Sequence, residues 1–79
     1  KNIMAQYYLG VLYYKGVKTK QDFIKGYAWV GITAAAGYKP AEKLRDEIDL
    51  YMNQEERESS RLYAKELWEK YGIQEEEKS

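Results

Sequence analysis

Apolar residues recur at spacings of three and four along most of the chain, and no stretch sustains the alternation that marks a β-strand. This periodicity predicts an all-α fold with four antiparallel helices, near residues 3–15, 22–36, 40–52 and 54–71. The first two segments are apolar nearly all round, whereas the last two are amphipathic. Because a helix without a polar face must be covered on more than one side, we expect neighbours around the first two helices.

The residues between these segments are typical of helix ends. Asp22 and Asn53 are good N-caps, and Glu56 lies three residues after Asn53, which completes a variant of the capping box. Pro40 suits the first turn of the third helix. The C-terminal ends are predicted at three glycines, namely Gly16, Gly37 and Gly72.

The second helix is rich in small residues. Residues 28–41 include one charged side chain, Lys39, in a chain that is 33% charged. Two interior glycines, Gly26 and Gly31, each cost a helix up to about 1 kcal/mol relative to alanine, so we expect them to serve close packing. This helix is therefore predicted to lie between other helices. The predicted shared core contains Leu9, Tyr13, Trp29, Ile32, Leu44 and Ile48.

A repeat with a period of 36 residues appears when residues 1–5 are placed over residues 37–41, which aligns Ala5 with Ala41. The first copy carries small, aromatic and charged residues in a fixed order: Ala5, Leu9, Gly10, Tyr13, Gly16, Asp22, Lys25, Trp29, Thr33, Ala34, Gly37 and Ala41. In order and spacing this pattern resembles the Sel-1-like repeat, a relative of the tetratricopeptide repeat. The sequence departs from the family pattern at Lys18, Thr19, Gly26 and Thr33.

The resemblance implies how the chain is divided. Residues 1–36 would form one Sel-1-like repeat, residues 37–73 a degenerate second helix pair that acts as a carboxy-terminal cap, and residues 74–79 a disordered tail. The second pair is interpreted as a cap because Arg45 and Asp46 stand where the family has Leu-Gly. Such pairs stack into a short right-handed α-solenoid whose terminal units carry a polar outer face. The family occurs widely in bacteria and also in eukaryotes.

The resemblance also implies a function, because members of the family scaffold protein complexes and lack catalytic groups. We expect an adaptor or scaffold that binds a protein or peptide, without catalytic residues, metal or cofactor. Tyrosine is enriched where proteins meet, so the face of the first helix turned away from Leu9 and Tyr13 is the candidate partner-binding site. It holds Met4, Tyr7, Val11 and Tyr14, with Lys15 and Lys18 nearby. The alternative reading is that these side chains cover a neighbouring repeat.

Binding of single-stranded nucleic acid is the alternative function. Four lysines, Lys15, Lys18, Lys20 and Lys25, lie close in sequence to Tyr14 and Tyr27, and stacking with phosphate contacts can hold a single strand. Residues 1–40 carry a net charge of +5, however, whereas residues 41–79 carry −5. Because the acidic half would repel a polyanion, protein binding is the preferred prediction.

The composition leaves few groups for catalysis or metal binding, since the chain has no histidine and no cysteine. The remaining candidates are two carboxylate clusters, Asp46, Glu47 and Asp49, and Glu55, Glu56 and Glu58. Acids in the first turn of a helix stabilise it, which accounts for the second cluster. The acidic run at residues 75–77 lacks the fixed geometry that a metal site requires. We therefore expect no enzymatic activity and no metal site.

No run of residues approaches the roughly 20 apolar positions of a membrane-spanning helix. Because the chain begins at Lys1, we expect a fragment or processed product, so the compartment stays open between cytoplasm and periplasm or secretion. Loss of an upstream repeat would uncover the first helix, and apolar patches above a few hundred Å² tend to be covered. We therefore expect a two-fold homodimer through the first helix.

Overall fold

The computed structural model describes residues 2–71, except for the side chain of Tyr71. It contains four helices, α1 (Ile3–Lys15), α2 (Phe23–Ala35), α3 (Lys39–Asp49) and α4 (Gln54–Tyr71), and residues 2–71 include no strand. The predicted all-α class and the four predicted helices are confirmed, with bounds that agree to within three residues. The predicted cap at Gly72 and the predicted tail at residues 74–79 lie outside the described residues.

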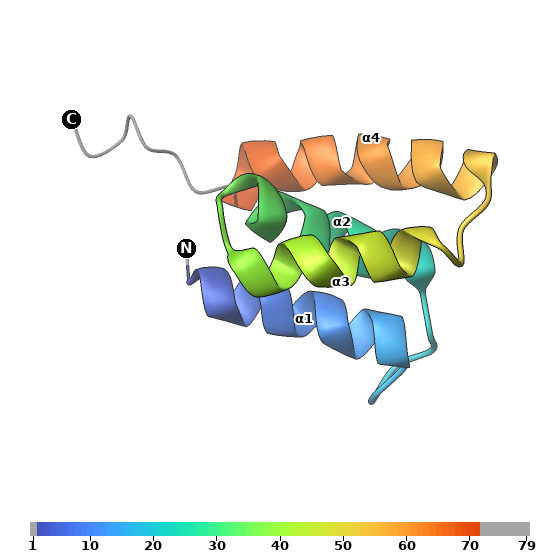
Figure 1. Cartoon of the computed structure of the whole chain (residues 1–79), viewed down its shortest axis with the longest axis horizontal. Helices are drawn as coiled ribbons and strands as arrows, with labels where there is room; N and C mark the ends of the chain where they lie inside the picture. Colours follow the sequence, from blue (N-terminus) through green and yellow to red (C-terminus); the bar gives the residue numbers. More distant parts are fainter. Residues whose placement is uncertain (1, 72–79) are drawn as a thin grey trace.

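Helix α2 is the centre of the fold, and the other three helices pack on it from different sides (Figure 1). Consecutive helices run in opposite directions, so α1 and α2 form an antiparallel pair. Helices α3 and α4 each approach α2 much more closely than they approach each other. Seven of the 13 residues of α2 are buried, which explains why this segment carries almost no charge.

Two glycines form the crossing between α1 and α2. A Cβ added to Gly10 would lie 2.6 Å from Cγ2 of Val30 and 3.1 Å from the carbonyl oxygen of Gly26. A Cβ added to Gly26 would lie 3.0 Å from the backbone nitrogen of Tyr14. The two backbones are therefore in direct contact, which confirms the packing role predicted for Gly26. The same prediction is wrong for Gly31, where an added Cβ would meet no atom within 4 Å.

The core consists of two clusters on different sides of α2. The first joins α2 to α3 and the residues after it, through Val30, Ala34, Ala41, Ile48 and Met52. The second joins α2 to α4, through Ala28, Trp29, Ile32 and Leu67. Of the predicted core, Trp29, Ile32 and Ile48 are buried, while Leu9, Tyr13 and Leu44 are half-buried against these clusters.

The predicted helix caps are also confirmed. The side chain of Asp22 accepts a hydrogen bond from the backbone nitrogen of Lys25 at 3.0 Å. Asn53 and Glu56 form the reciprocal capping box, with bonds of 2.8 and 2.9 Å. Gly16 and Gly37 have φ values of 74° and 96°, a region that favours glycine. The only non-glycine residue with positive φ among the described residues is Lys18, at 67°.

Candidate functional site: the groove between α2 and α4

The two tyrosines of the predicted binding face, Tyr7 and Tyr14, pack against other aromatic residues of the same chain. The ring of Tyr7 meets that of Tyr38 edge to face, with 5.2 Å between centroids. The ring of Tyr14 lies 5.8 Å from that of Phe23 and 6.4 Å from that of Tyr51. Both tyrosines are half-buried beside the cluster that joins α2 to α3. Their aromatic neighbours thus include Tyr38 and Tyr51, which belong to the predicted second helix pair.

The hydroxyl group of Tyr14 donates a hydrogen bond to Oε2 of Glu47 on α3, at 2.8 Å. This hydrogen bond, followed by burial and the negative charge of Glu47, raises the pKa of Tyr14 to about 12. Tyr14 is therefore a neutral donor that ties α1 to α3 across the physiological pH range.

The rest of the predicted face lies on the outer side of α1. Met4 and Tyr8 are each 62% exposed, and Lys15 and Lys18 are exposed, whereas Val11 is half-buried. Tyr8 had not been predicted as part of the site, although it follows Met4 by one helical turn. The outward surface of α1 is thus centred on Met4 and Tyr8, and Tyr7 and Tyr14 lie to one side of it.

The lysines proposed to contact nucleic acid are all exposed. Lys25 lies over the ring of Tyr13, with Nζ 5.6 Å from the centroid. The ring of Tyr14 packs against the rings of Phe23 and Tyr51. Lys18 and Thr19, together with Leu9 and Tyr13, line a small pocket at the connector after α1. Lys18 and Lys25 thus both lie near Tyr13 of α1.

Most of the candidate carboxylates have structural contacts. Besides Glu47 and the capping Glu56, Asp46 pairs with Arg45 at 3.4 Å. Asp49 pairs with Nε of Arg57 at 2.8 Å. Across the described residues, no group of three or more acidic side chains is arranged to hold a metal ion.

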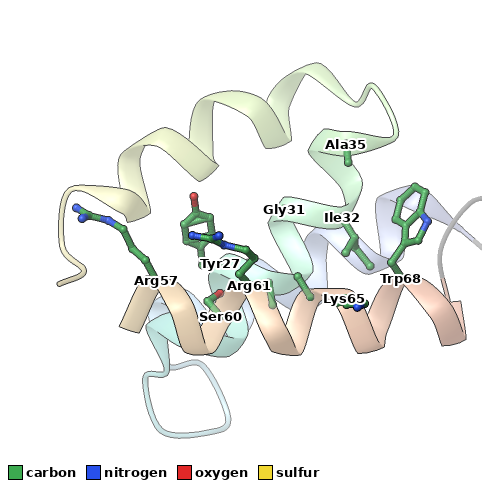
Figure 2. Close-up of a pocket in the computed structure, with 11 residues that line it drawn as sticks. Tyr27, Gly31, Ile32, Ala35, Arg57, Ser60, Arg61, Lys65 and Trp68 are labelled. Atoms are coloured by element: carbon green, nitrogen blue, oxygen red, sulfur yellow. The ribbon is translucent and has the colours of Figure 1, made fainter. Parts of the chain in front are cut away.

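A groove between α2 and α4 has a volume of about 420 Å³. Its floor is lined by small and apolar residues, and it is open at Gly31, since a Cβ added there would meet no atom within 4 Å. Figure 2 shows Trp68 at one end of the groove, Arg57 at the other and Arg61 between them. Helix α2 contributes Tyr27, Ala28, Gly31, Ile32 and Ala35, and α4 contributes Arg57, Ser60, Arg61, Ala64, Lys65 and Trp68.

Two buried contacts on α4 hold the walls of the groove together. The hydroxyl group of Ser60, which is 2% exposed, donates to the carbonyl oxygen of Ile24 at 2.8 Å. Two turns further along α4, Leu67 is buried against Ala28 and Trp29. Because both contacts are made by buried side chains, they fix the spacing of α2 and α4 beside the groove.

Three cations follow one edge of the groove at intervals of four residues, namely Arg57, Arg61 and Lys65. Arg57 donates to the carboxylate of Asp49 and, from Nη2, to its carbonyl oxygen at 3.2 Å. Arg61 and Lys65 are exposed, and neither forms an ion pair in the part of the chain that the structure describes. Like charges four residues apart on a helix repel each other at a cost of roughly 0.2 to 0.5 kcal/mol.

Tyr27 supplies a neutral hydroxyl group at the same groove. Burial is the main cause that raises the pKa of Tyr27 above its ordinary value, and the charge of Asp49 adds to it. Its hydroxyl group can therefore donate or accept a hydrogen bond beside the cationic edge.

The sequence analysis did not predict this groove. The small residues of the second helix were assigned to packing, and Arg57, Arg61 and Lys65 were not considered together. Their regular spacing on one amphipathic helix was the signal present in the sequence. Which neighbour that edge of α4 would face could not be known before the helices were placed.

No family model, curated protein or solved structure matches the chain. The resemblance to Sel-1-like repeats therefore stays a sequence-based prediction. No helix within the described residues is long and apolar enough to cross a membrane.

Proposed function

We propose that this chain is a protein-interaction module, a non-catalytic adaptor or scaffold segment, whose groove between α2 and α4 receives an apolar side chain of a partner. The observation that carries the proposal is the open apolar floor at Gly31, which the chain's own side chains leave uncovered. Recognition sites for other molecules are typically apolar hollows with a few polar groups at the edge, and this groove has that composition. The resemblance to Sel-1-like repeats supports the same class of function.

The groove is a better candidate than the first helix for a preformed site. Tyr7 and Tyr14 would have to leave their contacts with α3 and its neighbours before they could contact a partner. At the groove the flanking contacts of Ser60 and Leu67 already fix the walls, so binding there requires less rearrangement.

The test is a selection of phage-displayed random peptides on the immobilised protein, followed by affinity measurement on the enriched peptides. We expect peptides with a bulky apolar residue to be enriched, and we expect Gly31→Leu to abolish their binding by filling the floor. Circular dichroism would verify that this variant keeps its helices.

Leu62→Ala is the matched control, because Leu62 is 67% exposed on α4 and does not line the groove. It should leave the affinities unchanged. If no peptide is enriched, or if the enriched peptides bind Gly31→Leu as well as the original chain, the proposal is wrong.

A further inference from the structure

We infer that the partner segment bound at the groove is acidic, with two or more carboxylates beside its apolar anchor. This inference rests on the proposed function, and it is drawn from the charges along the α4 edge. Arg61 and Lys65 are separated by four residues, which corresponds to about 6 Å along a helix, and they project from the same face. Two carboxylates at matching spacing can reach both cations while an apolar side chain occupies the floor at Gly31.

Three acids of the described residues have neighbours other than Arg61 and Lys65. Asp49 accepts hydrogen bonds from Arg57 at its carboxylate and at its carbonyl oxygen. Glu66 and Glu69 belong to α4 as well, but they line a separate pocket with Trp29 and Tyr63. Arg61 and Lys65 therefore remain as the cations that a partner can neutralise.

The position of these cations also favours an acidic partner. They flank an apolar floor, and a bound segment would displace water from it, so that the attraction between opposite charges would be stronger than in open solvent. An acid placed between Arg61 and Lys65 would also offset the repulsion between these like charges. A basic or neutral segment would gain neither effect, so the edge discriminates between partners by charge.

The same phage selection tests this inference through the composition of the enriched peptides. We expect aspartate and glutamate to be over-represented beside the apolar anchor, and we expect a basic residue there to be depleted. In a second selection on the double variant Arg61→Gln and Lys65→Gln, the acidic preference should disappear while the apolar preference remains.

Affinities of the most enriched peptide provide a quantitative check. The double glutamine variant should bind it about tenfold more weakly, the loss expected for two exposed ion pairs. Raising the salt concentration should weaken binding to the original chain more than binding to the variant. The charge reversal Arg61→Glu with Lys65→Glu should prefer a peptide in which lysines replace the acids, and circular dichroism would confirm that both variants are folded.

The outcomes separate the two proposals. Enrichment of apolar peptides without acids, with binding still lost in Gly31→Leu, would overturn the acidic partner and leave the interaction module standing. Failure to enrich any peptide would overturn both. A mixed-sequence single-stranded oligonucleotide provides the remaining test. If the oligonucleotide displaces the peptide and has the higher affinity, the edge prefers polyanions in general, which also contradicts a protein partner at this edge.

Discussion

Replacing Gly10 by alanine would test the contact between α1 and α2. The added Cβ would lie 2.6 Å from Cγ2 of Val30 and 3.0 Å from the backbone nitrogen of the same residue. Carbon atoms in contact are normally about 3.5 to 4.0 Å apart, so the new methyl group would be roughly 1 Å too close. Val30 is 0% exposed and its backbone belongs to the central helix, so α1 would have to move outward.

The expected size of the effect combines two opposing contributions. Overpacking of a core typically costs about 1 to 3 kcal/mol. Replacement of a helical glycine by alanine returns about 0.5 to 1 kcal/mol through the unfolded chain and helix propensity. We therefore expect Gly10→Ala to lower the free energy of unfolding by up to about 2.5 kcal/mol, with a central value of about 1 kcal/mol. Gly10→Leu should lower it further, because the larger side chain cannot fit between the helices.

Gly31 provides a matched control, since it lies in the interior of α2 and an added Cβ would contact nothing within 4 Å. Gly31→Ala should therefore stabilise the protein by about 0.5 to 1 kcal/mol. The two alanine variants should differ by roughly 10 °C in Tm, given about 4 to 8 °C per kcal/mol for a domain of this size.

Urea denaturation followed by far-ultraviolet circular dichroism measures both free energies under the same conditions. Lys20→Ala, in the exposed connector, should stay within about 0.5 kcal/mol of the original chain. If Gly10→Ala proves as stable as Gly31→Ala, α1 and α2 are not in the contact described, and the role assigned to Gly10 is wrong.

Four further predictions concern other contacts. Ser60→Ala should lower the free energy of unfolding by about 1 kcal/mol, measured by urea denaturation, because the hydrogen bond from α4 to α2 is lost. Tyr14 has a folded-state pKa of about 12, above the ordinary 10.0, so its contribution to stability is present below pH 10 and is lost as the pH rises toward 12. Glu47→Gln should lower this pKa, which can be measured by phenolate absorbance with a Tyr14→Phe variant to assign the signal. If the pKa of Tyr14 is the same in Glu47→Gln, the hydrogen bond does not exist. Lys18→Gly should raise the midpoint of urea denaturation, because the left-handed backbone at this position disfavours a side chain, and an unchanged or lower midpoint would contradict that reading. Sedimentation at high micromolar concentration should show a homodimer that Tyr8→Lys disrupts, and a monomeric original chain would refute association through α1.

The local features of the fold were predictable from the sequence because they depend on neighbouring residues. The hydrogen bonds of Asp22 and of Asn53 with Glu56 span three residues, and their chemistry is the same in any helix start. The connector was less predictable. Lys18 adopts the left-handed conformation with φ 67°, which its residue type does not signal because such φ values are uncommon outside glycine.

The candidate site was not predictable to the same extent, because a helical wheel groups residues by face and leaves open what each face meets. Tyr7 and Tyr14 were correctly grouped, but the tertiary arrangement places α3 and its neighbouring residues beside them. The groove depends on two helices that are separated in sequence by all of α3. Its floor and its cationic edge therefore become one surface only when both helices pack on opposite sides of the groove.

The two glycines inside α2 explain why the composition of that helix does not determine the role of each residue. Gly26 and Gly31 are five residues apart, which turns them about 140° from each other around the helix. Gly26 faces α1, where the missing side chain allows two backbones to touch. Gly31 faces the groove, where the missing side chain leaves open space above Ala28 and Ile32. A helix that needed small residues only for packing would have no reason to keep glycine at position 31, because alanine there would favour the helix by about 0.5 to 1 kcal/mol without any clash. The open floor at Gly31 is thus a local cost to stability, and under the proposed function the binding of an apolar side chain from a partner would offset it.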